Sequence, residues 1–333
     1  MRMAALKVTT ALALVAGAIG MTTFGASAEA LRDDWCKDVK IRFFVGGAEG
    51  DGFGVIVYNG AVQAAHDTGA QVEYVFSGWN AEKMIQQLRE AVASAPDGIA
   101  MMGHPGDAPI LPLAEEASKA GIKMMYQNVD VPEVRKQFGG GYVGAQLDPQ
   151  GYALGAEAVR RFGLKAGDKA IVAANLDDTN RAVREAATMR AFEDAGLTVI
   201  HLQAPTEWAA DPNMGIPAFT AAIQANPDVK IIAYPGGQLL GTAPTYMEAA
   251  GKKPGEIINI GFDTSPQVVE GFKGGWVQLT SDQQPFMQGY MPVLSLCQQV
   301  VYGLGPMNVD TGAGFVTPDN YEAVAVLATE GLR

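Results

Sequence analysis

Amide and carboxylate side chains lie at the ends of several short apolar segments of this chain. Gln127 and Asn128 lie at the end of one such segment, Asp263 ends another, and Gln283 follows a third. Such groups suit hydroxyls, because each hydroxyl both donates and accepts a hydrogen bond, and every buried polar group must find a partner. Their recurrence at segment ends predicts a site for a hydroxyl-rich molecule.

Aromatic and basic residues occupy the same kind of position. Phe53 and Trp208 are candidates to cover the apolar C–H faces of a sugar ring, and His104 precedes a proline after another apolar segment. Arg184, or alternatively Arg181, lies at the start of an expected helix. A guanidinium offers five donors in a fixed plane and could hold several hydroxyls.

Each of these residues also has a structural alternative. Asp51 is as well suited to cap a helix as to contact a ligand, and Asp263 could cap a helix that begins at Ser265. The neutral ring of His104 could satisfy local backbone groups. Trp208 could be a hydrophobic plug. The prediction of a site therefore depends on the convergence of these residues.

The sequence contains none of the common catalytic motifs. It lacks H-E-x-x-H, G-x-S-x-G and G-x-x-x-x-G-K-[ST], and the glycines at 46–54 do not follow the G-x-G-x-x-G spacing of a dinucleotide site. We therefore expect no catalytic residue, no metal site and no cofactor. Carboxylate-dependent hydrolysis of a sugar has no fixed spacing, so a pair such as Asp51 and Asp263 keeps a secreted enzyme as an alternative.

Cys36 and Cys297 are the two cysteines of the chain. Their spacing is not that of a metal site. In an oxidising compartment they could form a disulfide, but spacing alone cannot establish the short approach of the Cα atoms that a disulfide needs. Pairing and two separate thiols both remain open.

The chain alternates apolar runs with amphipathic segments, and the runs break at Gly, Asp, Asn or Pro. This alternation predicts βα units with parallel sheets, and a glycine-rich break at 138–141 separates two halves. Ligands of such sheets bind beyond the carboxyl ends of the strands, where the residues above lie. We expect strands at 39–47, 71–76, 98–103, 122–127, 169–175, 197–203, 229–235, 257–263 and 276–282, helices at 53–68, 80–94, 107–120, 149–162, 179–195, 213–225, 237–251, 265–272 and 285–302, and then a tail rich in Gly and Pro.

The N-terminus has the three parts of an export signal. Arg2 and Lys7 precede an uncharged run that ends in Ala26-Ser27-Ala28, which predicts a signal peptide at 1–28. Its removal from the 333 residues leaves 305, which favours two domains. The mature chain would hold 22 basic and 36 acidic residues, a net charge of −14. Such a surface repels nucleic acid, so we expect no nucleic-acid partner.

The ordered motifs of this chain resemble those of the ribose-binding type of periplasmic sugar-binding proteins, the type I periplasmic binding proteins of bacterial ABC importers. The resemblance runs from residue 39 to about 305. It depends on Asp51-Gly52-Phe53, on Asp97-Gly98-Ile99 leading to His104-Pro105, on Ala120-Gly121-Ile122, and above all on Ile260-Gly261-Phe262-Asp263.

This resemblance implies an α/β fold with two Rossmann-like lobes, whose parallel sheets are joined by a three-crossover hinge. We place the N-terminal lobe at 38–145 plus 284–311 and the C-terminal lobe at 146–283 plus 312–333. The ligand would be clamped between the lobes. By position, the family's contacts fall on Asp51, Phe53, His104, Gln127, Asn128, Arg184 (or Arg181), Trp208, Asp263 and Gln283.

The resemblance also implies a function. We expect a monomeric, non-enzymatic receptor in the periplasm that delivers a small sugar or polyol to the permease subunits of an ABC transporter in the inner membrane. Many members have an Asp-Arg pair where this chain has Gln127 and Asn128, so the hydroxyl pattern of the ligand should differ from that of ribose. A signal receptor of the same fold is a further alternative.

Overall fold

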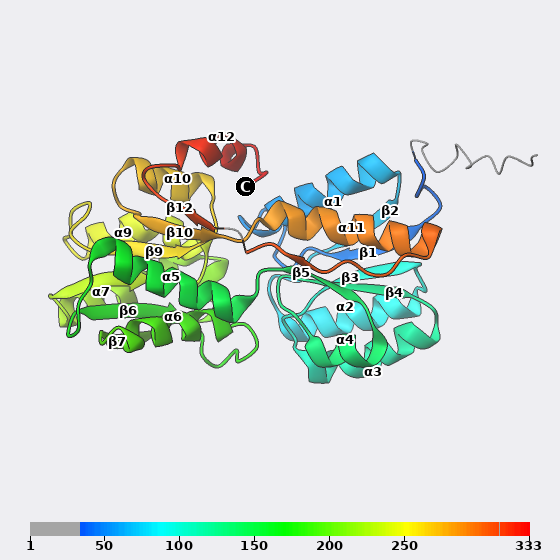
Figure 1. Ribbon diagram of the computed structural model, residues 1–333, viewed down its shortest axis with the longest axis horizontal. Coiled ribbons are helices and arrows are strands. Elements are labelled where there is room, and N and C mark those ends of the chain that lie inside the picture. Colours follow the sequence, from blue (N-terminus) through cyan, green and yellow to red (C-terminus); the bar gives the residue numbers. More distant parts are fainter. Residues whose placement is uncertain (1–33, 313) are drawn as a thin grey trace, which may run out of the picture. The chain divides into compact units, whose positions relative to one another are not determined.

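The computed structural model describes residues 34–312 and 314–333. The predicted signal peptide at 1–28 lies outside these residues. The described chain forms two six-stranded sheets, each with helices on both faces (Figure 1). This architecture confirms the predicted α/β fold.

The first sheet contains parallel strands in the spatial order β11-β5-β4-β3-β1-β2. Helices α1 and α11 lie side by side on one face, and α2, α3 and α4 lie on the other (Figure 1). We call this sheet with its helices the first lobe. Its elements are β1 (Lys40–Phe44), α1 (Gly54–Thr68), β2 (Gln71–Val75), α2 (Ala81–Ala93), β3 (Gly98–Met102), α3 (Asp107–Lys119), β4 (Lys123–Gln127), α4 (Pro132–Phe138), β5 (Gly141–Gly144), α11 (Pro285–Tyr302) and β11 (Val309–Asp310).

The second sheet has the order β12-β10-β9-β8-β6-β7, and only the pairing of β12 with β10 is antiparallel. Helices α5 and α6 pack together on one face, and the remaining helices lie on the other. We call this sheet with its helices the second lobe. Its elements are α5 (Leu147–Phe162), β6 (Lys169–Ala174), α6 (Val183–Asp194), β7 (Thr198–Gln203), the 3-10 helices η2 (Thr206–Ala209) and η3 (Pro212–Gly215), α7 (Ile216–Ala225), β8 (Val229–Ala233), α8 (Gly237–Gly241), α9 (Ala243–Ala249), β9 (Ile258–Phe262), α10 (Pro266–Lys273), β10 (Leu279–Asp282), β12 (Gly314–Val316) and α12 (Glu322–Thr329).

The central strands are buried on both faces, which explains their continuous apolar sequences. All five residues of β3 are buried. In β6, Ile171 and Ala173 belong to the core under α7 and α9, whereas Ala170 and Val172 belong to the core under α5 and α6. Successive side chains of a strand point to opposite faces, so a single strand contributes to both cores.

The fold differs from the sequence-based expectation in several places. The expected elements include neither α4 nor β5, and β5 begins within the glycine-rich break at 138–141. The helix expected at 237–251 is two helices, α8 and α9, which meet at Thr242. Pro244 lies in the first turn of α9 and has no N–H to continue the hydrogen bonding of α8. The expected tail contains β11, β12 and α12.

The chain passes between the two lobes three times. It crosses between β5 and α5, between β10 and α11, and between β11 and β12. This is the three-crossover hinge that the resemblance implied. The residue boundaries given above for the lobes remain predictions.

Cys36 and Cys297 form a disulfide, with their Cα atoms 5.7 Å apart. Both cysteines are buried in the core of the first lobe. The bond connects the segment before β1 to the C-terminal half of α11. Of the two alternatives that the sequence left open, the structure shows pairing.

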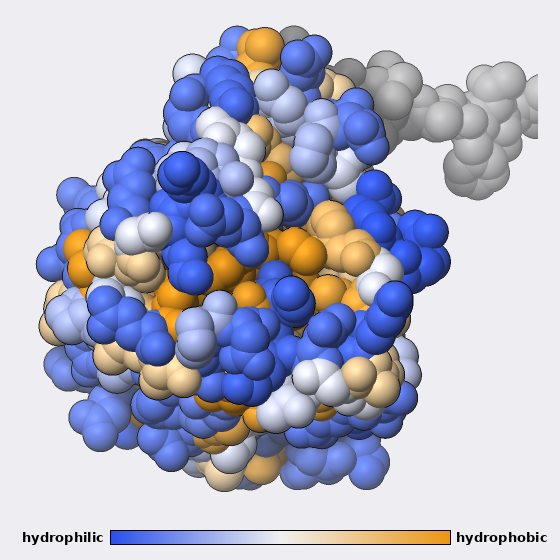
Figure 2. Space-filling view, turned by 90° about the vertical axis from the view of Figure 1, so that its left-hand side faces the viewer, coloured by the Kyte–Doolittle hydropathy of each residue, from blue (hydrophilic) through white to orange (hydrophobic). Residues whose placement is uncertain are grey.

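The outer face of the second lobe is largely hydrophilic, with hydrophobic residues gathered across its middle (Figure 2). Apolar atoms contribute about half or more of the surface of folded proteins, so this band by itself marks no binding site. Between residues 34 and 333, no described helix is long and apolar enough to cross a membrane.

Candidate binding site between the lobes

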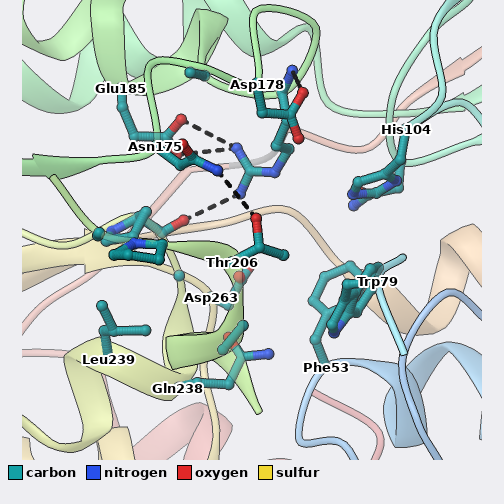
Figure 3. Close-up of a pocket in the computed structure, with 18 of the residues that line it drawn as sticks. Phe53, Trp79, His104, Asn175, Asp178, Glu185, Thr206, Gln238, Leu239 and Asp263 are labelled. Atoms are coloured by element: carbon teal, nitrogen blue, oxygen red, sulfur yellow. Dashed lines mark hydrogen bonds and ion pairs between the residues drawn. The ribbon is translucent and has the colours of Figure 1, made fainter. Parts of the chain in front are cut away.

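A cavity lies between the lobes, at the carboxyl ends of the strands of both sheets (Figure 3). Its lining comes from the segments that follow β1 to β4 in the first lobe and β6 to β10 in the second. It encloses about 830 Å³, including its opening to solvent.

Aromatic rings of the first lobe form one wall of the cavity. The ring centres of Phe53 and Trp79 are 5.8 Å apart, and those of Trp79 and His104 are 5.2 Å apart. Figure 3 shows these three side chains together on one side of the cavity. The indole N–H of Trp79 donates to Oδ2 of Asp51 at 3.0 Å, which fixes the orientation of the ring. This wall can cover the apolar face of a ring-shaped ligand.

His104 is uncharged in this wall. Only 9% of the surface of His104 is exposed, and its Nδ1 has no hydrogen-bond partner among the described residues. Burial, together with the nearby Arg181 and Arg184, lowers the pKa of His104 to about 3. A neutral imidazole has one donor and one acceptor nitrogen, so it can bind a hydroxyl in either sense.

A chain of hydrogen bonds runs from the first lobe to the second within the lining of the cavity. Asn128 Nδ2 donates to Gln283 Oε1 at 3.3 Å, and Gln283 Nε2 donates to Asp263 Oδ1 at 2.7 Å. All three residues are buried. Asn128 and Asp263 have φ values of 64° and 69°, a left-handed conformation that Asn and Asp tolerate better than most residues. This geometry directs their side chains to the cavity.

Burial dominates the electrostatics of Asp263. It raises the pKa of the carboxyl group above its ordinary value, while Arg184, the hydrogen bond from Gln283 and Arg181 act in the opposite direction. Asp263 Oδ1 is occupied by Gln283, and no described residue donates a hydrogen bond to Oδ2. The second oxygen can therefore accept from a ligand hydroxyl.

Charged and polar groups of the second lobe form the opposite wall. Arg181 Nη1 lies 3.0 and 3.2 Å from the two carboxylate oxygens of Glu185, and Arg181 Nη2 donates to the carbonyl oxygen of Pro235 at 3.1 Å. Asn175 Nδ2 donates to the hydroxyl of Thr206 at 3.0 Å. Figure 3 shows Glu185, Asn175 and Thr206 facing Trp79 and His104 across the cavity.

The structure brings five of the nine predicted residues together in the cavity lining and places four elsewhere. Those in the lining are Phe53, His104, Asn128, Asp263 and Gln283, and those outside it are Asp51, Gln127, Arg184 and Trp208.

Asp51 caps the start of α1, and it lines an adjoining pocket that shares Phe53, Trp79, Gln238 and Asp263 with the cavity. Its Oδ1 accepts from the backbone N–H groups of Phe53 at 3.1 Å and of Gly54 at 2.7 Å. Its Oδ2 accepts from Trp79 and, across the lobes, from Gln238 Nε2 at 3.3 Å. Of the two roles weighed for Asp51, the structure shows capping, together with a contact between the lobes.

The other three residues are turned into the protein. Gln127 is fully buried and donates to the carbonyl oxygen of Phe44 at 3.0 Å, because it still belongs to β4. Arg184 is also fully buried, with its guanidinium carbon 3.8 Å from the ring centre of Phe262, and Arg181 lines the cavity in its place. Gln127 and Arg184 therefore lie outside the cavity lining, and a contact of either residue with a ligand stays a prediction.

Trp208 packs in the hydrophobic core of the second lobe. Its ring centre lies 6.0 Å from that of Phe219, and the residue is 9% exposed. The turn of η2 directs its side chain to the core, and Thr206 from the same 3-10 helix lines the cavity. The alternative of a hydrophobic plug therefore describes its position.

Several lining residues were not among the predicted contacts. Trp79 follows β2 in the sequence Ser77-Gly78-Trp79-Asn80. Its position after the carboxyl end of a strand is therefore a signal that marks it as a candidate contact. Asn175 also follows a strand directly, whereas Glu185 lies within a helix, where no strand-end pattern marks it. The polar and aromatic lining residues that the sequence did not predict as contacts are Trp79, Asn175, Asp178, Glu185, Thr206 and Gln238.

The described residues contain no cluster of three or more His, Cys, Asp or Glu side chains that could hold a metal ion. The cavity instead combines an aromatic wall with amides, carboxylates and a guanidinium. Such an arrangement can bind a ligand that has both C–H faces and hydroxyl groups.

Comparison with known proteins agrees with this geometry. The model of the periplasmic binding protein domain family matches residues 41–303. The chain belongs to this family. It is 24% identical over 253 residues to a xylose/arabinose-binding protein of Sulfolobus acidocaldarius, covering 72% of this chain and 61% of that relative. The chain thus spans less than two thirds of the length of this family relative.

Two solved structures of the same fold hold a bound ligand. A carbohydrate transporter from Acidothermus cellulolyticus 11B, in complex with myo-inositol, matches with a TM-score of 0.75 and 24% identity, covering 89% of this chain and 99% of that one. An ABC transporter solute-binding protein from Burkholderia graminis C4D1M, in complex with D-arabinose, matches with a TM-score of 0.76 and 22% identity, covering 86% and 97%. These similarities show a common fold.

Proposed function

We propose that this protein is the periplasmic substrate-binding protein of an ABC transporter, and that it captures a small sugar or polyol between its lobes for delivery to the permease. The observation that carries this proposal is the cavity itself. An aromatic wall from the first lobe faces hydrogen-bonding groups from the second, which are the two surfaces that a sugar ring requires.

In this proposal, Phe53 and Trp79 cover a C–H face of the ring. Asn128, Gln283 and Asp263 bind hydroxyls from one side, and His104 binds a hydroxyl as a neutral imidazole. Asp263 would form the strongest of these contacts, because hydrogen bonds to an ionised group are about twice as strong as neutral ones. The ligands named for the two structural relatives, myo-inositol and D-arabinose, have the same chemistry.

Contacts between the lobes support a mechanism of closure. Asp51 and Gln238 meet across the opening at 3.3 Å. Gly106 of the first lobe lies so close to the second that a Cβ on it would be 2.4 Å from Nδ2 of Asn180. A ligand that contacts both walls would favour this closed arrangement over an open one, which is a population shift. The permease would recognise the closed form.

The remaining parts of the proposal concern the setting of the protein. We infer a monomer in the periplasm, exported by residues 1–28, with lobes at 38–145 plus 284–311 and 146–283 plus 312–333. The acidic surface argues against nucleic acid as a partner. The pattern of the cavity supports binding without chemical conversion, since it follows no catalytic motif.

A ligand screen tests the proposed function. The protein is expressed as the full chain, purified after export, and heated with D-arabinose, D-xylose, D-galactose, D-glucose or myo-inositol. A bound ligand at 100 times its Kd should stabilise the protein by roughly 2.7 kcal/mol. Recovery of the unchanged ligand supports a receptor, whereas a converted product would show an enzyme. Absence of stabilisation by any sugar or polyol would refute the proposal.

A further inference from the structure

Glu185 of α6 contacts two arginines at the second wall of the cavity. Its carboxylate oxygens lie 3.0 and 3.2 Å from Arg181 Nη1, and its Oε1 also lies 3.3 Å from Arg184 Nε. The residue is 3% exposed, so solvent screens these contacts little. One buried carboxylate therefore serves two guanidinium groups.

One further donor of each guanidinium group is directed at the protein. The carbonyl oxygen of Pro235 accepts from Arg181 Nη2 at 3.1 Å and from Arg184 Nη2 at 2.6 Å. Arg184 further stacks on the ring of Phe262. Both cations thus have partners within the second lobe, and of their buried nitrogen atoms only Arg184 Nη1, which is buried outside the cavity lining, has no hydrogen-bond partner among the described residues.

The charges around the cavity leave no excess of positive charge. Two guanidinium groups, of Arg181 and Arg184, face three carboxylates, of Asp178, Glu185 and Asp263. The first-lobe wall adds aromatic rings and an uncharged His104. An anionic ligand would enter beside these carboxylates, and the cation of the lining, Arg181, is already paired with Glu185. A buried charge without a partner of its own is costly.

We propose that Glu185 is a specificity-determining residue, which occupies both guanidinium groups and thereby excludes sugar acids from a cleft that accepts uncharged sugars or polyols. This inference rests on the proposed function, because it concerns the choice of ligand in the same cavity. Glu185 would select the charge of the ligand by neutralising the two arginines, while other residues make the main contacts with the sugar.

The test compares neutral sugars with the acids derived from them. Isothermal titration gives the Kd of D-galactose and D-galacturonate, of D-glucose and D-glucuronate, and of D-arabinose and D-arabinonate. In the wild type, we expect the acid of the best-bound pair to bind at least about tenfold more weakly than the neutral sugar. Tighter binding of the acid by the wild type would overturn the inference.

Two variants should move this ratio in opposite directions. Glu185→Gln keeps the size of the side chain and frees the guanidinium groups, so the ratio of acid Kd to neutral Kd should fall about tenfold or more. Arg181→Gln removes a cation and leaves the carboxylates, so the ratio should rise. The second variant provides a test even where Glu185→Gln does not fold.

Glu157→Gln is the matched control. Glu157 also pairs with two arginines, Arg160 and Arg161, but on α5 and outside the cavity lining. Its replacement removes the same charge and should leave the ratio unchanged. Equal ratios in the wild type and both cavity variants would refute the role of Glu185 while leaving the proposed function intact. Failure of every neutral sugar to bind the wild type would instead refute the proposed function.

Discussion

The two lobes place a tryptophan after equivalent strands and use it in opposite ways. β2 and β7 are each the edge strand beside the first strand of their sheet, and Trp79 and Trp208 follow them. Trp79 is held by Asp51 and lines the cavity, whereas Trp208 is turned by η2 into the core. The difference teaches that a topologically equivalent position does not determine whether a side chain serves the site or the core.

The same contrast extends to the walls of the cavity. The first lobe contributes aromatic rings with an uncharged imidazole, and the second contributes the arginine and the three carboxylates of the lining. A ligand therefore meets an apolar surface on one side and hydrogen-bonding groups on the other. Four substitutions or conditions test this division, from the largest expected effect to the smallest.

Trp208→Ala should destabilise the unliganded protein by about 3–5 kcal/mol, because it leaves a cavity in the core of the second lobe. Urea unfolding measures the loss. At a low temperature where the variant stays folded, its Kd for the best sugar should remain within about threefold of the wild type. Loss of binding by a fully folded variant would place Trp208 in the site after all.

Asp263→Asn should weaken sugar binding on the order of 100-fold, or about 2–3 kcal/mol, because hydrogen bonds to the charged carboxylate are lost. Asn tolerates the left-handed backbone at this position and can still accept from Gln283. Titration calorimetry gives the Kd. Asp228→Asn, at an exposed carboxylate paired with Lys169, is the control and should bind normally. Near-normal binding by the Asp263 variant would contradict the proposed contact.

His104 should make the folded protein less stable in mild acid. Its pKa in the folded state is about 3, below the ordinary value of about 6.5 in the unfolded chain. Between these values the unfolded state binds more protons, so stability is lost as the pH falls below about 6.5. From pH 7 to pH 5, the wild type should lose about 2 kcal/mol more than His104→Gln, by urea unfolding. Equal losses would mean that the wall does not lower the pKa of His104.

Trp79→Ala should weaken sugar binding by about 1–2 kcal/mol, which is about five- to thirtyfold, because one aromatic face is removed. The unliganded stability should change less than in Trp208→Ala, since Trp79 is only partly buried. Trp276→Ala replaces another partly buried tryptophan, remote from the cavity lining, and should leave the Kd unchanged. The comparison fails if the two variants bind alike.

The fold was predictable where the pattern of apolar residues is continuous. The central parallel strands are buried on both faces, so each of them is a continuous apolar run in the sequence. β11 and β12 were missed because they contain two and three residues and depend on pairing with β5 and β10, which the local sequence does not show. α12 lay in the same stretch, whose Gly and Pro content suggested a tail.

The position of the site was predictable, but the direction of its side chains was only partly so. Reading strand ends found Asn128, Asp263 and Gln283, which form the hydrogen-bond chain between the lobes. It could not separate Gln127 from Asn128, since the first ends a strand and points into the sheet while the second has left-handed backbone and faces the cavity. Such a choice depends on one φ angle and on the neighbours that hold it.

The position of α11 has a consequence for the order in which the protein can be completed. This helix packs against α1 in the first lobe, yet residues 285–302 follow strands β6 to β10 in the chain. Because synthesis begins at the N-terminus, the five strands β6 to β10 of the second lobe are made before α11. The first lobe therefore begins to be made first but is complete only after most of the second lobe has been made. The disulfide of Cys36 can form only when its partner, 261 residues downstream, has been made.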